Sequence, residues 1–401
     1  MNRFNRVTSR KTLGTLLTCC LITVTATDAY AGPREQAKRM HDRIAGVPPS
    51  AAVLDAMETS IVGGDALEAA ELAMENSAFY TVTLKNFATP WTNEDQTVFA
   101  PLNDYTATVI GMIRDNVPFN TALSADLLYV GASGLGLPAY SMTNNNHYEA
   151  MESQGIDLKE ELTATTQSAL TNLPASATAG IMTTRAAAQA FFSAGTNRAM
   201  FRFTLMNHLC TDLEPIKDTT RSPDRIRQDV SRSPGGDSRI FLNACVGCHA
   251  GMDPMAQAFA YYDYNETSSS IEYNGPDTID PDTGTRVQGK YLINSDNFKY
   301  GYVTTDDHWD NYWRSGPNAA LGWSSSLSGS GSGAKSLGME LANSETFARC
   351  QAKKVFKTMC LRSPVDAADR SQIDSMTTSF KANNYSMKRI FAEAAVYCMG
   401  D

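Results

Sequence analysis

The segment Cys245-Val246-Gly247-Cys248-His249 constrains this chain more than any other part of its sequence. Two cysteines that are separated by two residues and followed at once by histidine form the attachment motif of a c-type haem. In such a site the two thiols add across the porphyrin vinyl groups, and the histidine lies under the iron as its proximal ligand. The motif therefore predicts one covalently attached haem c, with Cys245 and Cys248 as the attachment residues and His249 as axial iron ligand.

Three other interpretations of the motif remain open. A zinc site needs a second Cys/His pair, but Cys350 and Cys360 are ten residues apart and about 80° from a common helix face. A thioredoxin-like dithiol needs a strand-to-helix turn within a βαβ unit, whereas residues 237–244 have a helical pattern. The third alternative is a plain structural disulfide within the motif. Haem attachment is the favoured interpretation because the spacing and the adjacent histidine satisfy all of its requirements.

The first thirty-one residues have the pattern of an export signal. Basic residues between Arg3 and Lys11 precede a short apolar run over 13–24, and Ala29-Tyr30-Ala31 offers the small residues that signal peptidase needs. The run is too short to cross a bilayer as a helix, and no later run is long enough. We therefore predict a signal peptide over 1–31, a protein that does not span the membrane, and export to a bacterial periplasm or outer cell surface. A lipoprotein modified at Cys19 is the alternative.

Four further cysteines lie outside the motif and the leader, namely Cys210, Cys350, Cys360 and Cys398. In an oxidising compartment an even number of spare cysteines predicts disulfides, and four cysteines allow three connectivities. We favour Cys360 with Cys398, which would join the last two helices, and Cys210 with Cys350. Free buried thiols are the alternative.

Composition and charge favour a globular protein that binds no nucleic acid. The 401 residues are 42% hydrophobic and 19% charged, which is enough apolar material for a sizeable core. A formal net charge of -9 repels phosphate backbones. The sequence does not predict the oligomeric state.

Apolar periodicity predicts a mainly α, multi-helical fold that contains a c-type haem-binding helix and a loop-rich insert. Asp65 and Ser344 are expected N-caps, and Pro254 is expected to stop the haem helix. Helical patterns recur at 158–170, 184–194, 198–210 and 238–249. The expected modules are a signal peptide (1–31), an N-terminal helical module (32–175), a cytochrome c-like haem module (176–295), a loop-rich Ser/Gly insert (296–333) and a C-terminal helical module (334–401).

A second axial ligand is expected from a methionine or a histidine on the opposite face of the haem, and methionine is favoured over the remaining histidines, His41, His147, His208 and His308. Met182, within Gly180-Ile181-Met182-Thr183, and Met339, within Gly338-Met339-Glu340, are the two candidates for this distal ligand. Ordinary core packing is the alternative for each. If neither reaches the iron, the sixth position is open and the protein becomes a candidate enzyme.

Short motifs shared with one group of bacterial proteins are spread over residues 40–400. They are Leu123-Ser124-Ala125-Asp126, Tyr129-Val130, Gly180-Ile181-Met182-Thr183, Asn197-Arg198-Ala199, Leu209-Cys210, Cys245 to His249, Met252 to Ala256, Leu341-Ala342, Phe347-Ala348-Arg349-Cys350 and Tyr385-Ser386-Met387-Lys388. With these motifs the chain resembles the uncharacterised single-haem cytochrome c proteins of the planctomycete type, which have several modules and C-terminal cytochrome-associated domains. The resemblance implies covalent haem at Cys245, Cys248 and His249. The chain departs from those proteins at Met255-Ala256, where they often have Leu-Gly, and in the extra stretch 290–335.

Together these observations predict an exported monohaem c-type cytochrome that passes single electrons to or from a redox partner protein or a small oxidant. Two alternatives remain, because a simple carrier needs only one small domain and this chain is much longer. One is a haem enzyme, peroxidase-like or oxidising an exported substrate. The other is an envelope interaction scaffold in which the haem is structural and the loop 296–333 engages a partner.

Overall fold

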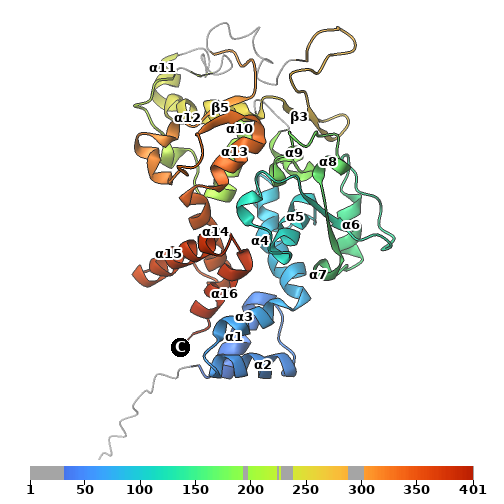
Figure 1. The fold of residues 1–401 in the computed structure, drawn as a ribbon, viewed down its shortest axis with the longest axis vertical. Coiled ribbons are helices and arrows are strands. Elements are labelled where there is room, and N and C mark those ends of the chain that lie inside the picture. The colour runs from blue at the N-terminus through green and yellow to red at the C-terminus, as the bar shows by residue number, and fades with distance from the viewer. Residues whose placement is uncertain (1–30, 193–196, 224, 227–237, 288–301, 401) are drawn as a thin grey trace, which may run out of the picture.

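The computed structural model describes residues 31–192, 197–223, 225–226, 238–287 and 302–400. Helices dominate this part of the chain, and its strands form three separate two-stranded antiparallel sheets (Figure 1). The mainly α fold class is therefore confirmed. The predicted signal peptide, apart from Ala31, lies outside the described residues, as do residues 288–301 at the junction of the predicted haem module and insert.

Three short helices at the start of the described chain pack against one another, and the first and third of them also pack against the last helix. They are α1 (Pro33–Ala45), α2 (Ala51–Val62) and α3 (Ala66–Met74), and the last helix is α16 (Met387–Tyr397). The predicted N-cap of α3 is confirmed, since the Asp65 carboxylate accepts a hydrogen bond of 3.0 Å from the Glu68 backbone N–H. The beginning and the end of the described chain therefore lie together (Figure 1).

The next region surrounds α5 (Asp104–Arg114), whose residues 104–113 are all buried. Gly111 lets a strand approach this helix, because a Cβ there would lie 2.2 Å from the Tyr129 ring. That strand is β1 (Leu128–Gly131), which pairs with β2 (Leu162–Thr165). The other elements here are η1 (Phe79–Leu84), α4 (Lys85–Ala88), η2 (Thr89–Thr92), η3 (Phe119–Thr121), α6 (Asn146–Ser153), α7 (Leu158–Glu161), α8 (Gln167–Leu170), η4 (Gly180–Thr183) and α9 (Arg185–Phe191).

The helical prediction over 158–170 is wrong in its middle. β2 divides the segment into α7 and α8, and Leu128 of β1 lies opposite Thr165 of β2. Thr163 and Thr165 are β-branched, so they suit an extended backbone that has a pairing partner. The partner strand is more than thirty residues away in the sequence, and a local apolar pattern carries no information about it.

The region that contains the Cys-X-X-Cys-His motif lies at the opposite end of the molecule from α1, α2 and α3 (Figure 1). Its elements are α10 (Arg198–Thr204), η5 (Leu205–Leu209), η6 (Glu214–Ile216), α11 (Ser238–Ile240), η7 (Phe241–Cys245), α12 (Val246–Ala256), η8 (Gln257–Phe259), β3 (Tyr262–Asn265), β4 (Ser270–Tyr273), β5 (His308–Asp310), η10 (Tyr312–Arg314), η11 (Pro317–Leu321) and β6 (Ser330–Ser332). β3 pairs with β4, and β5 pairs with β6. The end of the Ser/Gly stretch is therefore a strand, and Trp309 and Trp313 beside it are buried.

The C-terminal helices connect this region to the N-terminal helices. They are α13 (Gly333–Ala342), α14 (Glu345–Cys360) and α15 (Ala367–Ala382), followed by α16. α14 begins as predicted, because the Ser344 hydroxyl accepts a hydrogen bond from the Phe347 N–H.

Two disulfides fasten α14, one in its first half and one at its last residue. Cys210 is bonded to Cys350, and Cys360 is bonded to Cys398. These are the two pairs that the sequence favoured among three connectivities. The first bond ties the end of η5 to α14, and the second ties the end of α14 to the turn after α16.

One hydrophobic cluster extends from Ala37 to Ala395, so helices from the N-terminal, central and C-terminal parts of the chain share a core. In the part of the chain that the structure describes, none of the helices combines the length and the apolar character needed to cross a bilayer.

Candidate functional site

The Cys-X-X-Cys-His motif lies where the π-helical turn η7 continues into α12. Cys245, Cys248 and His249 are half-buried, while Val246 and Gly247 between them are buried. Residues at positions i, i+3 and i+4 of a helix lie on one face. Both thiols and the imidazole therefore share a partly accessible face, and the residues between them anchor the turn to the fold.

The two motif cysteines are free thiols, whereas the other four described cysteines are paired in disulfides. The Cys248 thiol donates a weak hydrogen bond to the Leu213 carbonyl, with a sulfur–oxygen distance of 3.7 Å. Burial and then the negative charge of Glu214 raise the pKa of Cys248. Cys248 is therefore a protonated thiol at neutral pH, unlike the thiolate of a dithiol oxidoreductase.

The imidazole of His249 is held by a buried carboxylate one helical turn further on. Its Nδ1 lies 3.1 Å from Oδ1 of Asp253, whose side chain has no exposed surface. Arg198 of α10 donates to both oxygens of that carboxylate, at 2.8 and 3.1 Å. Because Nδ1 is engaged with Asp253, Nε2 is the ring nitrogen left for a metal ligand bond.

Apolar side chains lie against one part of the motif, whereas the charged residues Glu214 and Lys217 lie near Cys248. The Phe241 ring centroid lies 5.9 Å from the His249 ring centroid, and Ile226, Phe241 and Val246 form a small buried cluster against Cys245. Two large apolar side chains on the preceding turn face solvent, with Ile240 45% and Leu242 55% exposed. Two free thiols, an imidazole with Nε2 available and the adjoining apolar side chains are what a c-type haem requires, so these residues fit that group.

A tryptophan fixes the motif helix from its buried side. A Cβ at Gly251 would lie 1.8 Å from Nε1 of Trp313, whose side chain is 1% exposed. Pro254 lies inside α12 and does not stop it, contrary to the sequence prediction. The proline removes one backbone donor near the end of the helix, and the chain tightens into η8 from Gln257 onward.

Replacement of Gly251 by alanine is expected to destabilise the protein by about 1–3 kcal/mol, because the new methyl group would overlap a buried indole. Gly247→Ala is the matched control in the same helix. Its Cβ would meet Thr219 Cγ2 at 3.1 Å, a contact that small shifts relieve, and alanine gains helix propensity over glycine. The free energy of unfolding in urea measures both effects. Equal losses in the two variants would show that Trp313 does not set the position of α12.

The two candidate distal ligands lie on other elements. Met182 is 2% exposed on η4, which contacts α5 and α9. Met339 is 43% exposed on α13, which contacts β5 and η8. The main neighbours of α12 among the described elements are α10, β5, η7, η8 and η10. The structure thus brings Cys245, Cys248 and His249 together and places both methionines on elements outside this group, so their distal role stays a prediction.

Two other histidines are held within the fold. His208 is buried, and the Tyr105 hydroxyl lies 2.7 Å from its Nε2. Burial and the nearby Lys354 ammonium lower the pKa of His208 well below its usual range. Nε2 of His147 accepts a hydrogen bond from the Gly131 N–H at 2.9 Å. Each of these imidazoles therefore has a structural contact at Nε2.

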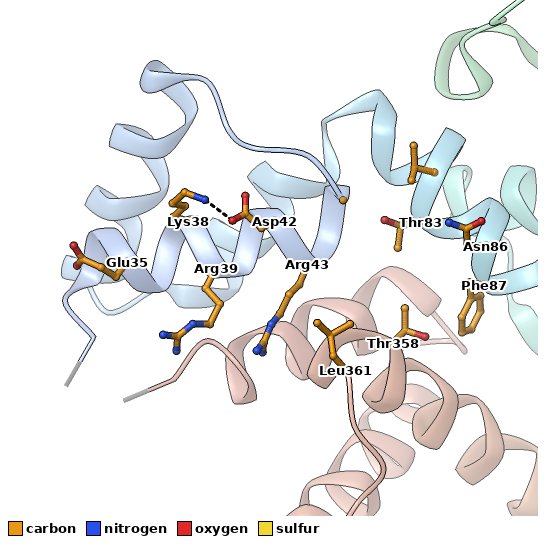
Figure 2. Close-up of a pocket in the computed structure, with 12 residues that line it drawn as sticks. Glu35, Lys38, Arg39, Asp42, Arg43, Thr83, Asn86, Phe87, Thr358 and Leu361 are labelled. Carbon is orange, nitrogen blue, oxygen red and sulfur yellow. Dashed lines mark hydrogen bonds and ion pairs between the residues drawn. The ribbon is translucent and has the colours of Figure 1, made fainter. Parts of the chain in front are cut away.

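One cavity lies far from the motif, between α1, η1, α4 and the end of α14 (Figure 2). It has a volume of about 670 Å³ and an apolar wall that includes Phe87 and Leu361. Arg39 and Arg43 on its rim donate to the backbone carbonyls of Met399 and Cys398. These arginines hold the C-terminal segment in place, and none of the motif residues lines the cavity.

The sequence prediction missed Asp253 and Arg198 as parts of the site. The spacing of four residues between His249 and Asp253 was a signal for their contact, because both lie on one helix face. Arg198 lies on α10, and its part in the site follows only from the packing of α10 against α12.

Comparison of the chain with known proteins identifies no homologue. No family model matches the chain, and no curated protein or solved structure matches it significantly. Among the residues that the structure describes, no group of three or more His, Cys, Asp or Glu side chains is arranged to hold a bare metal ion.

Proposed function

We propose that this chain is an exported monohaem c-type cytochrome that transfers single electrons to or from a redox partner protein or a small oxidant. Cys245 and Cys248 hold one haem c covalently, and His249 is an axial ligand of its iron. Met182 and Met339 remain the candidates for the distal position. The resemblance to single-haem cytochrome c proteins supports the same assignment.

One observation carries the proposal. Four of the six described cysteines form two disulfides. Cys245 and Cys248 are unpaired, and they lie on the helix face that also carries His249. A structural disulfide within the motif would pair these two thiols with each other. A structural zinc site needs four ligands, and the described residues offer no such group. Haem attachment needs both thiols free and the imidazole beside them.

The chain's own residues have distinct tasks in this function. The helical turn places both thiols on one side of His249, and Asp253 fixes the imidazole so that Nε2 serves as the ligand atom. Ile240 and Leu242 provide apolar surface beside the attachment point, and burial against such groups excludes water from a porphyrin. When bound, haem supplies a one-electron redox centre at its iron.

Export to a periplasm or outer cell surface belongs to the same proposal. Disulfides persist in oxidising compartments, and the chain has two of them. The N-terminal pattern of basic, apolar and small residues supports export as well.

The proposal is tested by producing the full chain in a bacterium that carries the c-type haem maturation machinery. A pyridine haemochrome assay on the denatured protein is expected to find one covalently bound haem per chain. The reduced spectrum is expected to be unchanged by carbon monoxide, because two firm axial ligands leave no open position. Rapid carbon monoxide binding would favour the haem-enzyme alternative, and folded protein without covalent haem would overturn the proposal.

A further inference from the structure

The contact between His249 and Asp253 differs from an ordinary surface ion pair because its carboxylate is fully buried. The Asp253 side chain has no exposed surface and the His249 side chain is 18% exposed. Arg198 grips the same carboxylate with two donors and is itself only 17% exposed. A buried carboxylate is costly unless charged or polar partners compensate it. Arg198 compensates the burial of this carboxylate, and the packed fold thereby fixes the carboxylate beside the imidazole.

The geometry also determines which ring nitrogen carries the proton. A carboxylate is only an acceptor, so Nδ1 of a neutral His249 must be the donor in the 3.1 Å contact. A carboxylate that accepts from Nδ1–H increases the basicity of the opposite nitrogen. An axial ligand of this kind donates more electron density and stabilises the oxidised state of a bound iron.

Arg198 acts in the opposite sense. Its guanidinium draws electron density from the carboxylate and adds a positive charge near the imidazole. Asp253 and Arg198 therefore have opposite effects on the electron donation of His249. Both residues lie on helices that pack against each other, α12 and α10.

We propose that Asp253 is a positioning residue which fixes the Nδ1–H tautomer of His249 and lowers the reduction potential of the haem, and that the positive charge of Arg198 limits this effect. The inference rests on the proposed function, because it concerns the haem held by Cys245, Cys248 and His249. It goes beyond haem attachment, since it assigns the control of the potential to two residues outside the motif.

The test is a spectroelectrochemical titration of the haem-loaded full chain. Asp253→Asn is expected to shift the ratio of oxidised to reduced protein at a fixed applied potential about tenfold toward the reduced form, which corresponds to about 59 mV for one electron. Arg198→Gln is expected to shift the ratio in the opposite direction. A purely structural disturbance of α10 and α12 would shift the reduction potential of both variants in the same direction. Shifts of equal sign would therefore overturn the inference. An unchanged potential in Asp253→Asn would also overturn it.

A second measurement covers the case in which Asp253→Asn does not mature. In the full chain carrying Cys245→Ala and Cys248→Ala, which has only five histidines to assign, long-range proton–nitrogen NMR spectra report the tautomer of His249. The Nδ1–H form is expected with Asp253 present and is expected to lose its predominance in Asp253→Asn. Predominance of the Nε2–H form with Asp253 present would overturn the inference. A wild-type chain that attaches no haem would instead overturn the proposed function.

Discussion

Replacement of both Cys245 and Cys248 by alanine is expected to abolish covalent haem attachment completely. Each thiol forms one thioether bond, and no described cysteine is left to replace them because the other four are bonded to one another. Single variants keep one thiol and are expected to retain haem at reduced yield. The measurement is the haem that remains with the chain after denaturation and solvent extraction, read by haemochrome absorbance and by intact mass.

The matched control is the double variant Cys360→Ala/Cys398→Ala. It also removes two sulfur atoms, but from the disulfide at the far end of α14. This variant is expected to keep its haem and to lose only stability. If the motif variant retained haem after denaturation, or the control lost it, the assignment of attachment to Cys245 and Cys248 would be wrong.

A haem-free result for the motif variant also has to be separated from misfolding. The motif thiols are half-buried and contribute little to the main core, which does not include them. Their replacement by alanine is therefore expected to preserve the helical circular dichroism of the chain and both disulfides. Loss of haem together with an intact helical signal would place the defect in the attachment chemistry.

Features that depend on neighbouring residues in the sequence could be predicted well. The N-caps at Asp65 and Ser344 are confirmed, because an N-cap needs only a side-chain oxygen and a backbone N–H two or three residues later. The helical character of the motif segment follows from the same short-range forces. The two disulfide pairs were favoured by placing each cysteine on a predicted helix, and the structure has the same pairs.

Apart from the two disulfide pairs, features that depend on distant partners could not be predicted. β2 exists because β1 supplies its hydrogen bonds, and β6 forms from Ser330 to Ser332, residues of low strand propensity, because β5 lies beside it. Pro254 lies within α12 although it cannot donate a hydrogen bond to the preceding turn, so the packing around this helix outweighs the local preference.

The same limit applies to the candidate site. The five-residue motif indicated the thiols and the imidazole, since haem attachment requires them in sequence. The Asp253 carboxylate and the Arg198 guanidinium act through packing between α10 and α12. A search of the sequence for haem ligands therefore finds the atoms that bond to the haem and misses those that tune it.

Removal of the Cys210–Cys350 disulfide is expected to destabilise the protein more than removal of Cys360–Cys398. A disulfide restricts the unfolded chain in proportion to the logarithm of the loop that it closes. The two bonds close loops of 140 and 38 residues, for which loop-closure entropy gives about 5 and about 4 kcal/mol respectively. Because the total stability of a protein is typically only about 5–15 kcal/mol, either loss is a large fraction of the whole.

Urea unfolding of the two double alanine variants measures these losses under identical conditions. Each variant replaces two cysteines by alanine, so both lose the same number of sulfur atoms. The destabilisation from the resulting cavities therefore largely cancels when the two free energies of unfolding are compared. The two loops follow one another along the chain and do not overlap. Their effects should therefore add in the quadruple variant. A larger loss for Cys360→Ala/Cys398→Ala would contradict the loop-entropy argument and would assign the main effect to the packing of the last helices, α14 and α16, against α1 and α3.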